Sequence, residues 1–163
     1  MKRFAFLLAA AAVAIACNHD VAGLGPPSDP ATETFNPSLG VDISQMTRMS
    51  NGVYYRDVVE GPLAGDTVTA KTVSVKVNYA GYLKDGKLID SGSGVTLPLS
   101  GLITGFKSGM MGMRVGGKRK LVIPSELGYG GDAIKNPDLT IKIPRQSTLI
   151  FDVEVLAVTD VTS

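Results

Sequence analysis

Residues 71–83, Lys-Thr-Val-Ser-Val-Lys-Val-Asn-Tyr-Ala-Gly-Tyr-Leu, decide the fold of this chain. Apolar residues at 73, 75, 77 and 79 alternate with polar residues at 72, 74, 76 and 78, which puts the two kinds of side chain on opposite faces of a β-strand. One apolar and one polar face are typical of an antiparallel sheet with one face in water. Asp85-Gly86 follows and favours a tight hairpin turn, because both positions tolerate positive φ.

The remaining elements are predicted from weaker patterns. We expect strands at 53–60, 118–123 and 148–159, and Asn51-Gly52 and Gly61-Pro62 mark the turns around the first of them. The only candidate helix spans 103–110, where Gly105 and Gly109 lower the helix propensity. Tertiary packing therefore has to hold this helix. We predict an α+β fold in which a curled antiparallel sheet covers one short central helix.

Composition limits the functions that the chain can have. Its 163 residues include 16 basic and 15 acidic side chains, and removal of Lys2 and Arg3 would leave 14 basic residues and a net charge of about −1. We expect no nucleic-acid partner, because no overall positive field is present. His19 is the only histidine and Cys17 the only cysteine, so no metal and no cofactor are expected. The run 118–120, Lys-Arg-Lys, is interpreted as the charged entry to a hairpin.

The N-terminal segment has the pattern of a secretory signal. Met1-Lys2-Arg3 is positive and residues 4–16 carry no polar side chain, a run shorter than the roughly 20 residues of a membrane-spanning helix. Residues 14–16, Ala-Ile-Ala, fit ordinary signal cleavage, whereas Ala16-Cys17 resembles the bacterial lipoprotein box. We favour lipidation of Cys17, because this thiol has no second cysteine as a disulfide partner. With Asn18 after it, the site predicts an exported, periplasmic protein anchored to the outer membrane.

The chain is predicted to have three parts: a signal peptide at 1–16, a flexible tether at 17–40 and one folded domain at 41–163. Residues 25–30, Gly-Pro-Pro-Ser-Asp-Pro, show the composition of the tether, which has no hydrophobic periodicity. The folded domain has a normal size for a single core. We expect it to be monomeric and to contact the membrane only through the lipid.

Four segments in a fixed order resemble the FKBP family of peptidyl-prolyl cis-trans isomerases. They are 77–82 (Val-Asn-Tyr-Ala-Gly-Tyr), 84–91 (Lys-Asp-Gly-Lys-Leu-Ile-Asp-Ser), 123–130 (Ile-Pro-Ser-Glu-Leu-Gly-Tyr-Gly) and 151–156 (Phe-Asp-Val-Glu-Val-Leu). The resemblance extends over nearly all of 52–159. It implies about five antiparallel strands wrapped around one short helix, and an enzyme that accelerates isomerisation of Xaa-Pro bonds in polypeptides without a metal, nucleophile or cofactor.

The resemblance also implies roles for individual residues. Asp90 would lie near the polarised substrate carbonyl and pair with Tyr79. The Ile103 N–H and the Tyr129 hydroxyl would donate hydrogen bonds to carbonyl groups of the bound peptide. The floor and walls of the pocket would be formed by Phe106, Ile89, Leu102, Ile143, Phe151, Val95 and Leu97.

Several wall positions differ from the residues that are common in the family. Phe106 stands where Trp is usual, and Ile89 where Phe is common. Val95 and Leu97 stand where a Phe-x-Phe pair is common. Aliphatic side chains still exclude water, so we expect the isomerase pocket to persist with reduced affinity for FK506-like macrolides. The loop at 130–142 is longer than in the smallest members of the family.

Two other functions fit parts of the sequence. A non-catalytic FKBP-like chaperone or binding module would use the same cleft, and the substitutions at 89, 95 and 106 leave this alternative open. Residues 90–92, Asp-Ser-Gly, also resemble the signature of aspartic proteases. Such proteases need two carboxylates that share a proton, and the sequence contains no second copy of the signature.

Overall fold

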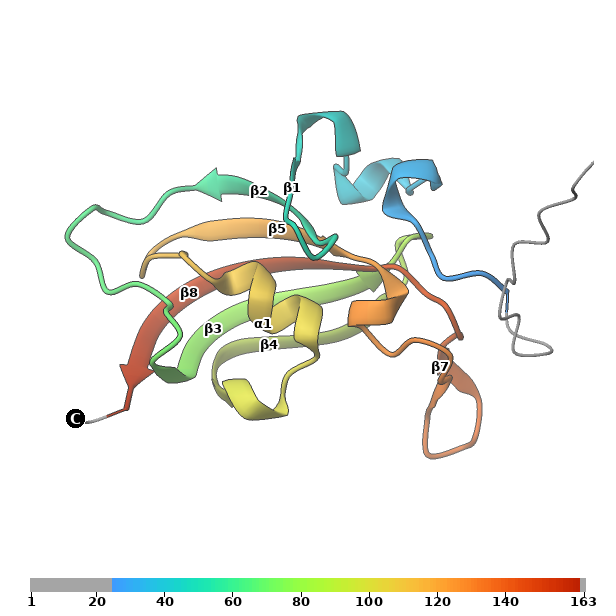
Figure 1. Ribbon diagram of the computed structural model, residues 1–163. Coiled ribbons are helices and arrows are strands. Elements are labelled where there is room, and N and C mark those ends of the chain that lie inside the picture. The colour runs from blue at the N-terminus through green and yellow to red at the C-terminus, as the bar shows by residue number, and fades with distance from the viewer. Residues whose placement is uncertain (1–24, 162–163) are drawn as a thin grey trace, which may run out of the picture.

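The computed structural model describes residues 25–161, and within that range no helix has the length and apolar character needed to cross a membrane. A six-stranded antiparallel sheet has the order β1-β2-β5-β8-β3-β4 and curves around α1 (Figure 1). Its strands are β1 Thr47–Arg48, β2 Tyr54–Val59, β3 Thr72–Leu83, β4 Leu88–Pro98, β5 Lys118–Ile123 and β8 Leu149–Asp160. The predicted fold class is confirmed, and the strand beyond the expected five is the two-residue edge strand β1.

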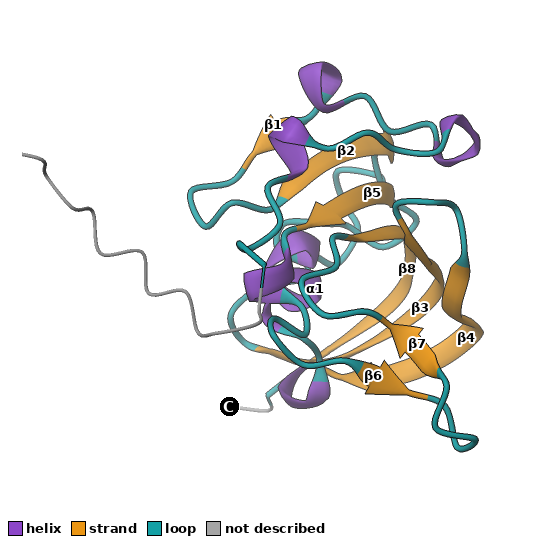
Figure 2. Ribbon diagram, turned by 90° about the vertical axis from the view of Figure 1, so that its right-hand side faces the viewer, coloured by secondary structure: helices purple, strands orange, loops and turns teal. Residues whose placement is uncertain are grey.

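The remaining elements are short. The helix α1 spans Thr104–Met110, close to the predicted range. Strands β6 (Ile134–Lys135) and β7 (Ile141–Ile143) form a separate hairpin inside the long loop (Figure 2). Single 3₁₀ turns are η1 Pro30–Thr32, η2 Pro37–Leu39, η3 Ile43–Gln45, η4 Leu99–Gly101 and η5 Ser125–Leu127.

The alternation in β3 departs from the prediction at its first residues. Val75 and Val77 are buried as expected, but Val73 is 43% exposed and Thr72 is buried. The pairing of β3 with β8 shifts register between Thr72 and Ser74, and such a bulge changes which side chains face the core. The Thr72 hydroxyl donates to Asp160 Oδ1 at 2.7 Å, which satisfies a buried polar group.

The N-terminal segment 28–46 packs on the outer face of the sheet, beside β2 (Figure 1). Leu39 is buried in a small second core whose other buried members are Tyr54, Val122 and Ile150. The Asn36 N–H donates to the Lys84 carbonyl at 2.8 Å. The structure therefore corrects the predicted boundary: residues 28–40 belong to the folded domain and not to a tether, because their apolar side chains cover an apolar patch of the sheet.

The basic run 118–120 is also placed differently from its interpretation as a charged hairpin entry. The Arg119 side chain is 8% exposed and pairs with both oxygens of Asp57, at 2.7 and 2.9 Å. Its Nη1 donates to the carbonyls of Gly109 and Met111 at 2.9 and 3.1 Å. Arg119 thus satisfies carbonyl groups at the C-terminal end of α1 and ties this end to β2 and β5.

Two glycines allow α1 to lie directly on β5. A Cβ atom at Gly105 would overlap Ile123 Cγ2, and one at Gly109 would lie 2.7 Å from Leu121 Cδ2. These distances are too short for real Cβ contacts, so only glycine permits this approach of the helix backbone to the strand. The low helix propensity of α1 is thus the consequence of a packing requirement. Phe106 and Met110 of the same helix are buried in the main core.

The substitution Gly105→Ala tests this packing. Propensity alone would make the variant about 1 kcal/mol more stable, but overpacking of a tight core costs about 1–3 kcal/mol. We expect a lower free energy of unfolding in urea for Gly105→Ala than for the wild type. Gly101→Ala is the control, because its Cβ would meet only Pro98 Cγ at 4.0 Å. An increase in stability for Gly105→Ala would contradict the direct contact between α1 and β5.

Candidate functional site

Three aromatic rings from three elements meet between the sheet and the helix. The ring centroids of Phe106 on α1 and Phe151 on β8 lie 4.8 Å apart, and Tyr79 on β3 lies 6.0 and 6.5 Å from them. The rings are tilted or edge-on to one another, which is the favoured geometry for aromatic pairs. Both phenylalanines are buried whereas Tyr79 is half-buried. The cluster is therefore an aromatic floor with a hydroxyl at its edge.

Glycines in the neighbouring strands make room for these rings. Gly81 is the cross-strand partner of Phe151, and Gly92 is the partner of Tyr79. A Cβ at Gly81 would overlap the Phe151 ring, and one at Gly92 would lie 2.8 Å from Tyr79 Cε1. The roles of these two glycines were not among the sequence-based predictions. Glycine in the interior of a strand, which often marks a close approach, was the signal that would have found them.

Tyr79 and Asp90 form the hydrogen-bonded pair that the family resemblance implied. The Tyr79 hydroxyl donates to Asp90 Oδ2 at 2.8 Å, and Asp90 Oδ1 accepts from the Ser91 N–H at 3.0 Å. Burial, the hydrogen bond to Asp90 and the negative charge of Asp90, in that order, raise the pKa of Tyr79 to about 12. The phenol is therefore neutral at physiological pH and holds the carboxylate in one orientation.

Tyr129 lies close to the same carboxylate, on the turn that follows η5. Burial raises the pKa of Tyr129, and the charge of Asp90 raises it further. The side chain of Tyr129 is 38% exposed, and its hydroxyl donates to no other residue within 25–161. The charge of Asp90 thus acts on two phenols: Tyr79 is hydrogen-bonded to it, and Tyr129 is available to a ligand.

Ile103 offers a backbone donor at the start of α1. Its carbonyl accepts from the N–H groups of Phe106 and Lys107, both at 3.1 Å, while its own N–H has no acceptor among the described residues. N–H groups at the start of a helix have no partner within the helix. The Ile103 N–H is therefore available for a ligand carbonyl, three residues before the buried Phe106.

The seven residues predicted for the floor and walls fall into two groups by exposure. Phe106, Phe151, Ile89 and Ile143 are buried in the main core. Leu102, Val95 and Leu97 are half-buried and pack against that core. Ile89 and Ile143 therefore have little surface left for a ligand, whereas the three half-buried residues have some.

A second concave surface lies on the opposite face of the sheet. A cavity of about 450 Å³ is lined by residues that include Val58, Asn78, Ala80, Asp152 and Glu154. Asn78 and Ala80 flank Tyr79 in β3, so their side chains point away from the aromatic floor. Asn78 Nδ2 already donates to Glu154 Oε2 at 2.8 Å. Tyr79 and Gly92 also line this cavity, but Asp90, Tyr129 and Phe106 do not. We therefore assign the functional site to the aromatic side, where Tyr79 meets these residues.

The site has the parts to bind an apolar group and to donate hydrogen bonds to carbonyls. The hydrogen-bond partners of Asp90 are Tyr79 and Ser91, and neither is a carboxylate, so residues 90–92 lack the proton-sharing pair of an aspartic protease. Within 25–161 no three His, Cys, Asp or Glu side chains gather in a group that could hold a metal. Cys17 and His19 lie outside the described residues.

The phenol pair predicts a titration at high pH. We expect Tyr79 to ionise near pH 12 instead of the ordinary 10.0, and Asp90→Asn to lower this pKa by removing the charge while burial still acts. Folding raises the pKa of Tyr79, so the neutral phenol stabilises the folded state. This contribution to the free energy of unfolding is complete below about pH 10 and is lost as the pH rises toward 12. Phenolate absorbance measures the ionisation, and Tyr79→Phe identifies the step. An unchanged titration in Asp90→Asn would show that the charge does not act on Tyr79.

Comparison with known proteins places the chain in a family. Residues 65–156 match the family model described as FKBP-type peptidyl-prolyl cis-trans isomerase. The FKBP-type isomerase FkpA of Escherichia coli K12 is 39% identical over 134 residues, which are 77% of this chain and 43% of that protein. The FK506-binding protein of Neisseria meningitidis serogroup B is 38% identical over 113 residues, which are 66% of this chain and 96% of that protein. The chain thus spans less than half the length of the FkpA relatives.

Solved structures agree with this comparison. The peptidyl-prolyl isomerase of Pseudomonas syringae pv. tomato has a TM-score of 0.62 and 30% identity, over 71% of this chain and 82% of the other. The crystal structure of E. coli FkpA has a TM-score of 0.60 and 38% identity, over 71% of this chain and 52% of the other. The sequence match, the sheet curled around α1 and the phenol pair on the aromatic floor all lead to one conclusion: the chain belongs to the FKBP family of peptidyl-prolyl cis-trans isomerases.

Proposed function

We propose that this protein accelerates cis-trans isomerisation of Xaa-Pro bonds. The observation that carries the proposal is the hydrogen bond between Tyr79 and Asp90 at the edge of the aromatic floor. Proline is the residue whose preceding bond isomerises slowly enough to limit folding. An apolar floor accommodates the proline ring, and neutral donors give hydrogen bonds to the neighbouring carbonyl groups without a change of charge.

The physical problem for such an enzyme is the loss of amide resonance at the twisted transition state, a barrier of about 18–20 kcal/mol. The twisted amide is less dipolar than the planar amide, and its nitrogen is a better hydrogen-bond acceptor. A dry apolar site with a few fixed donors therefore stabilises the transition state more than the ground state. No covalent step is needed.

Each group of the site has a distinct part in this mechanism. Phe106 and Phe151 hold the proline ring and keep water away. The Ile103 N–H and the Tyr129 hydroxyl fix carbonyls of the peptide on the two sides of the bond. Asp90, oriented by Tyr79, lies next to the polarised carbonyl and disfavours its planar, dipolar form.

A non-catalytic binding module is the second candidate, because Val95 and Leu97 present aliphatic surface where aromatic walls are common in the family. The same substitutions weaken the cage for a macrolide such as FK506, so we propose that macrolides bind with reduced affinity. One measurement separates the two candidates. An isomerase raises the rate of cis-trans exchange of the Xaa-Pro bond in the bound peptide, whereas a binding module does not.

The purified protein is expected to accelerate cis-trans exchange of a short Xaa-Pro peptide. Tyr129→Phe and Asp90→Ala each remove a polar contact to the substrate of about 0.5–1.5 kcal/mol, so each should lower kcat/KM by roughly threefold to tenfold. Tyr82→Phe is the matched control. Tyr82 also lies on β3, but its side chain packs against the second core, on the outer face of the sheet and away from the site. Binding of the peptide with no acceleration would overturn the isomerase and support the binding module.

We also propose that the protein works outside the cytoplasm on newly exported polypeptides, held at the outer membrane through Cys17. The sequence features that support this lie in residues 1–24, outside the described residues. Because segment 28–46 packs on the sheet, residues 17–27 alone would separate the anchor from the domain. Fully extended, they reach roughly 36 Å at ~3.3 Å per residue.

Mass spectrometry of the protein extracted from bacterial membranes tests the anchor. We expect a chain that begins at Cys17 and carries an added acyl mass, and Cys17→Ser should release the protein into the soluble fraction without changing its isomerase rate. A mature chain that begins at residue 17 with an unmodified thiol would instead support ordinary signal cleavage.

A further inference from the structure

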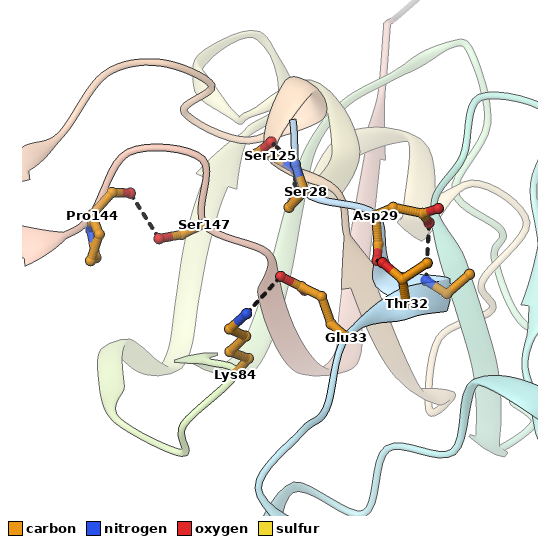
Figure 3. A network of polar contacts seen from close by, with 9 residues as sticks. Ser28, Asp29, Thr32, Glu33, Lys84, Ser125, Pro144 and Ser147 are labelled. Atoms are coloured by element: carbon orange, nitrogen blue, oxygen red, sulfur yellow. Dashed lines mark hydrogen bonds and ion pairs between the residues drawn. The ribbon is translucent and has the colours of Figure 1, made fainter. Parts of the chain in front are cut away.

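Ser28 in the N-terminal segment is joined to Ser125 by two reciprocal hydrogen bonds (Figure 3). The Ser28 N–H donates to Ser125 Oγ at 2.9 Å, and the Ser125 N–H donates to Ser28 Oγ at 2.7 Å. The two residues are 97 positions apart in sequence, and Ser125 is fully buried. This link fixes the start of the N-terminal segment 28–46 against the start of η5.

Ser125 opens the turn η5, and Ser28 acts as its cap. The preceding residue Pro124 makes no side-chain capping hydrogen bond. N–H groups at the start of a helical turn lack partners within the turn, and a serine hydroxyl is a preferred acceptor for them. Here the acceptor comes from a residue far away in the chain.

The Ser125 backbone holds the turn that carries Tyr129. Its carbonyl accepts from the N–H groups of Gly128 and Gly130, at 2.9 and 2.8 Å, and these residues lie on either side of Tyr129. The Ser125 hydroxyl donates to Gln146 Oε1 at 2.9 Å, and the Gln146 N–H donates to the Gly130 carbonyl at 2.8 Å. These bonds fix the backbone on both sides of Tyr129.

The backbone of Gln146 has a conformation that a glutamine does not prefer, and this hydrogen-bond network holds it there. Its φ is +54°, a conformation that residues other than glycine rarely adopt and that persists only when the surroundings impose it. The hydrogen bonds to Ser125 and Gly130 are those surroundings. The turn with Tyr129 and the loop with Gln146 are thus fixed to each other through Ser125.

The residues after Ser28 are themselves held in place (Figure 3). Asp29 Oδ1 accepts from the Ala31 N–H at 3.0 Å and caps η1. Glu33 lies 2.9 Å from Lys84 Nζ, at the β3–β4 turn. Ser28 therefore belongs to an ordered segment that has a second attachment at the β3–β4 turn.

We propose that Ser28 is a positioning residue for Tyr129, and that the N-terminal segment is thereby part of the catalytic device. Ser28 holds Ser125, and Ser125 holds the glycines on both sides of Tyr129. The effect on catalysis rests on the proposed function, in which Tyr129 donates to the substrate, but the effect on the location of the Tyr129 ring does not.

A double-mutant cycle tests this proposal in the full chain. Ser28→Ala is expected to lower kcat/KM by roughly threefold to tenfold, the range of a lost cap, and Ser28→Thr, which keeps the hydroxyl, should restore most of it. Because Ser28 acts only through Tyr129, Ser28→Ala should have no further effect in a Tyr129→Phe background. Ser38→Ala is the matched control, because Ser38 is an exposed serine of the same segment whose hydroxyl makes no hydrogen bond within 25–161.

A second readout does not depend on isomerase activity. In NMR spectra of protein with labelled tyrosines, Ser28→Ala should move the ring signals of Tyr129 and lower its pKa toward the ordinary value, whereas Ser38→Ala should do neither. If the wild type accelerates no peptide but this shift appears, the proposed function fails and the positioning role stands. Unchanged Tyr129 signals, or an equal loss of rate from Ser28→Ala in both backgrounds, would overturn the role of Ser28.

Discussion

The direct contact between the backbone of α1 and strand β5 is the constraint on which the rest of this structure depends. It requires glycine at 105 and 109, because a Cβ at either position would collide with Ile123 or Leu121. Once the helix lies this close, Phe106 reaches Phe151. The Ile103 N–H, which has no acceptor within 25–161, lies three residues before Phe106. Arg119 completes the attachment, since its guanidinium is paired with Asp57 and donates to two carbonyls at the end of the helix.

The same logic of close approach extends to the site. Glycines opposite Phe151 and Tyr79 leave space for the rings, because they have no side chains that would occupy it. The polar groups above that floor are neutral phenols, a backbone N–H and one carboxylate that already accepts two hydrogen bonds. The proposed reaction, in which an amide becomes less dipolar, needs exclusion of water and orientation more than proton transfer.

Local patterns in the sequence predicted most elements of the fold, because strand alternation and the Asp85-Gly86 turn depend on neighbouring residues. Family resemblance predicted the Tyr79–Asp90 pair. The exposure of Val73 could not be predicted, since it follows from a bulge set by pairing with β8. The packing of 28–40 was missed because the patch it covers is assembled from Tyr54, Val122 and Ile150 on three different strands. The Ser28–Ser125 link was missed for the same reason, as it joins residues that only the folded chain brings together.

The central claim is that proline peptides bind on the aromatic side of the sheet, against the floor that α1 positions. The most direct measurement is a map of amide and tyrosine chemical shifts while an Xaa-Pro peptide is added to the protein. The account predicts that the Ile103 amide and the rings of Tyr79 and Tyr129 shift together, in proportion to bound peptide. Shifts confined to the outer face, around Val58 and Asp152 at the cavity of about 450 Å³, would contradict it.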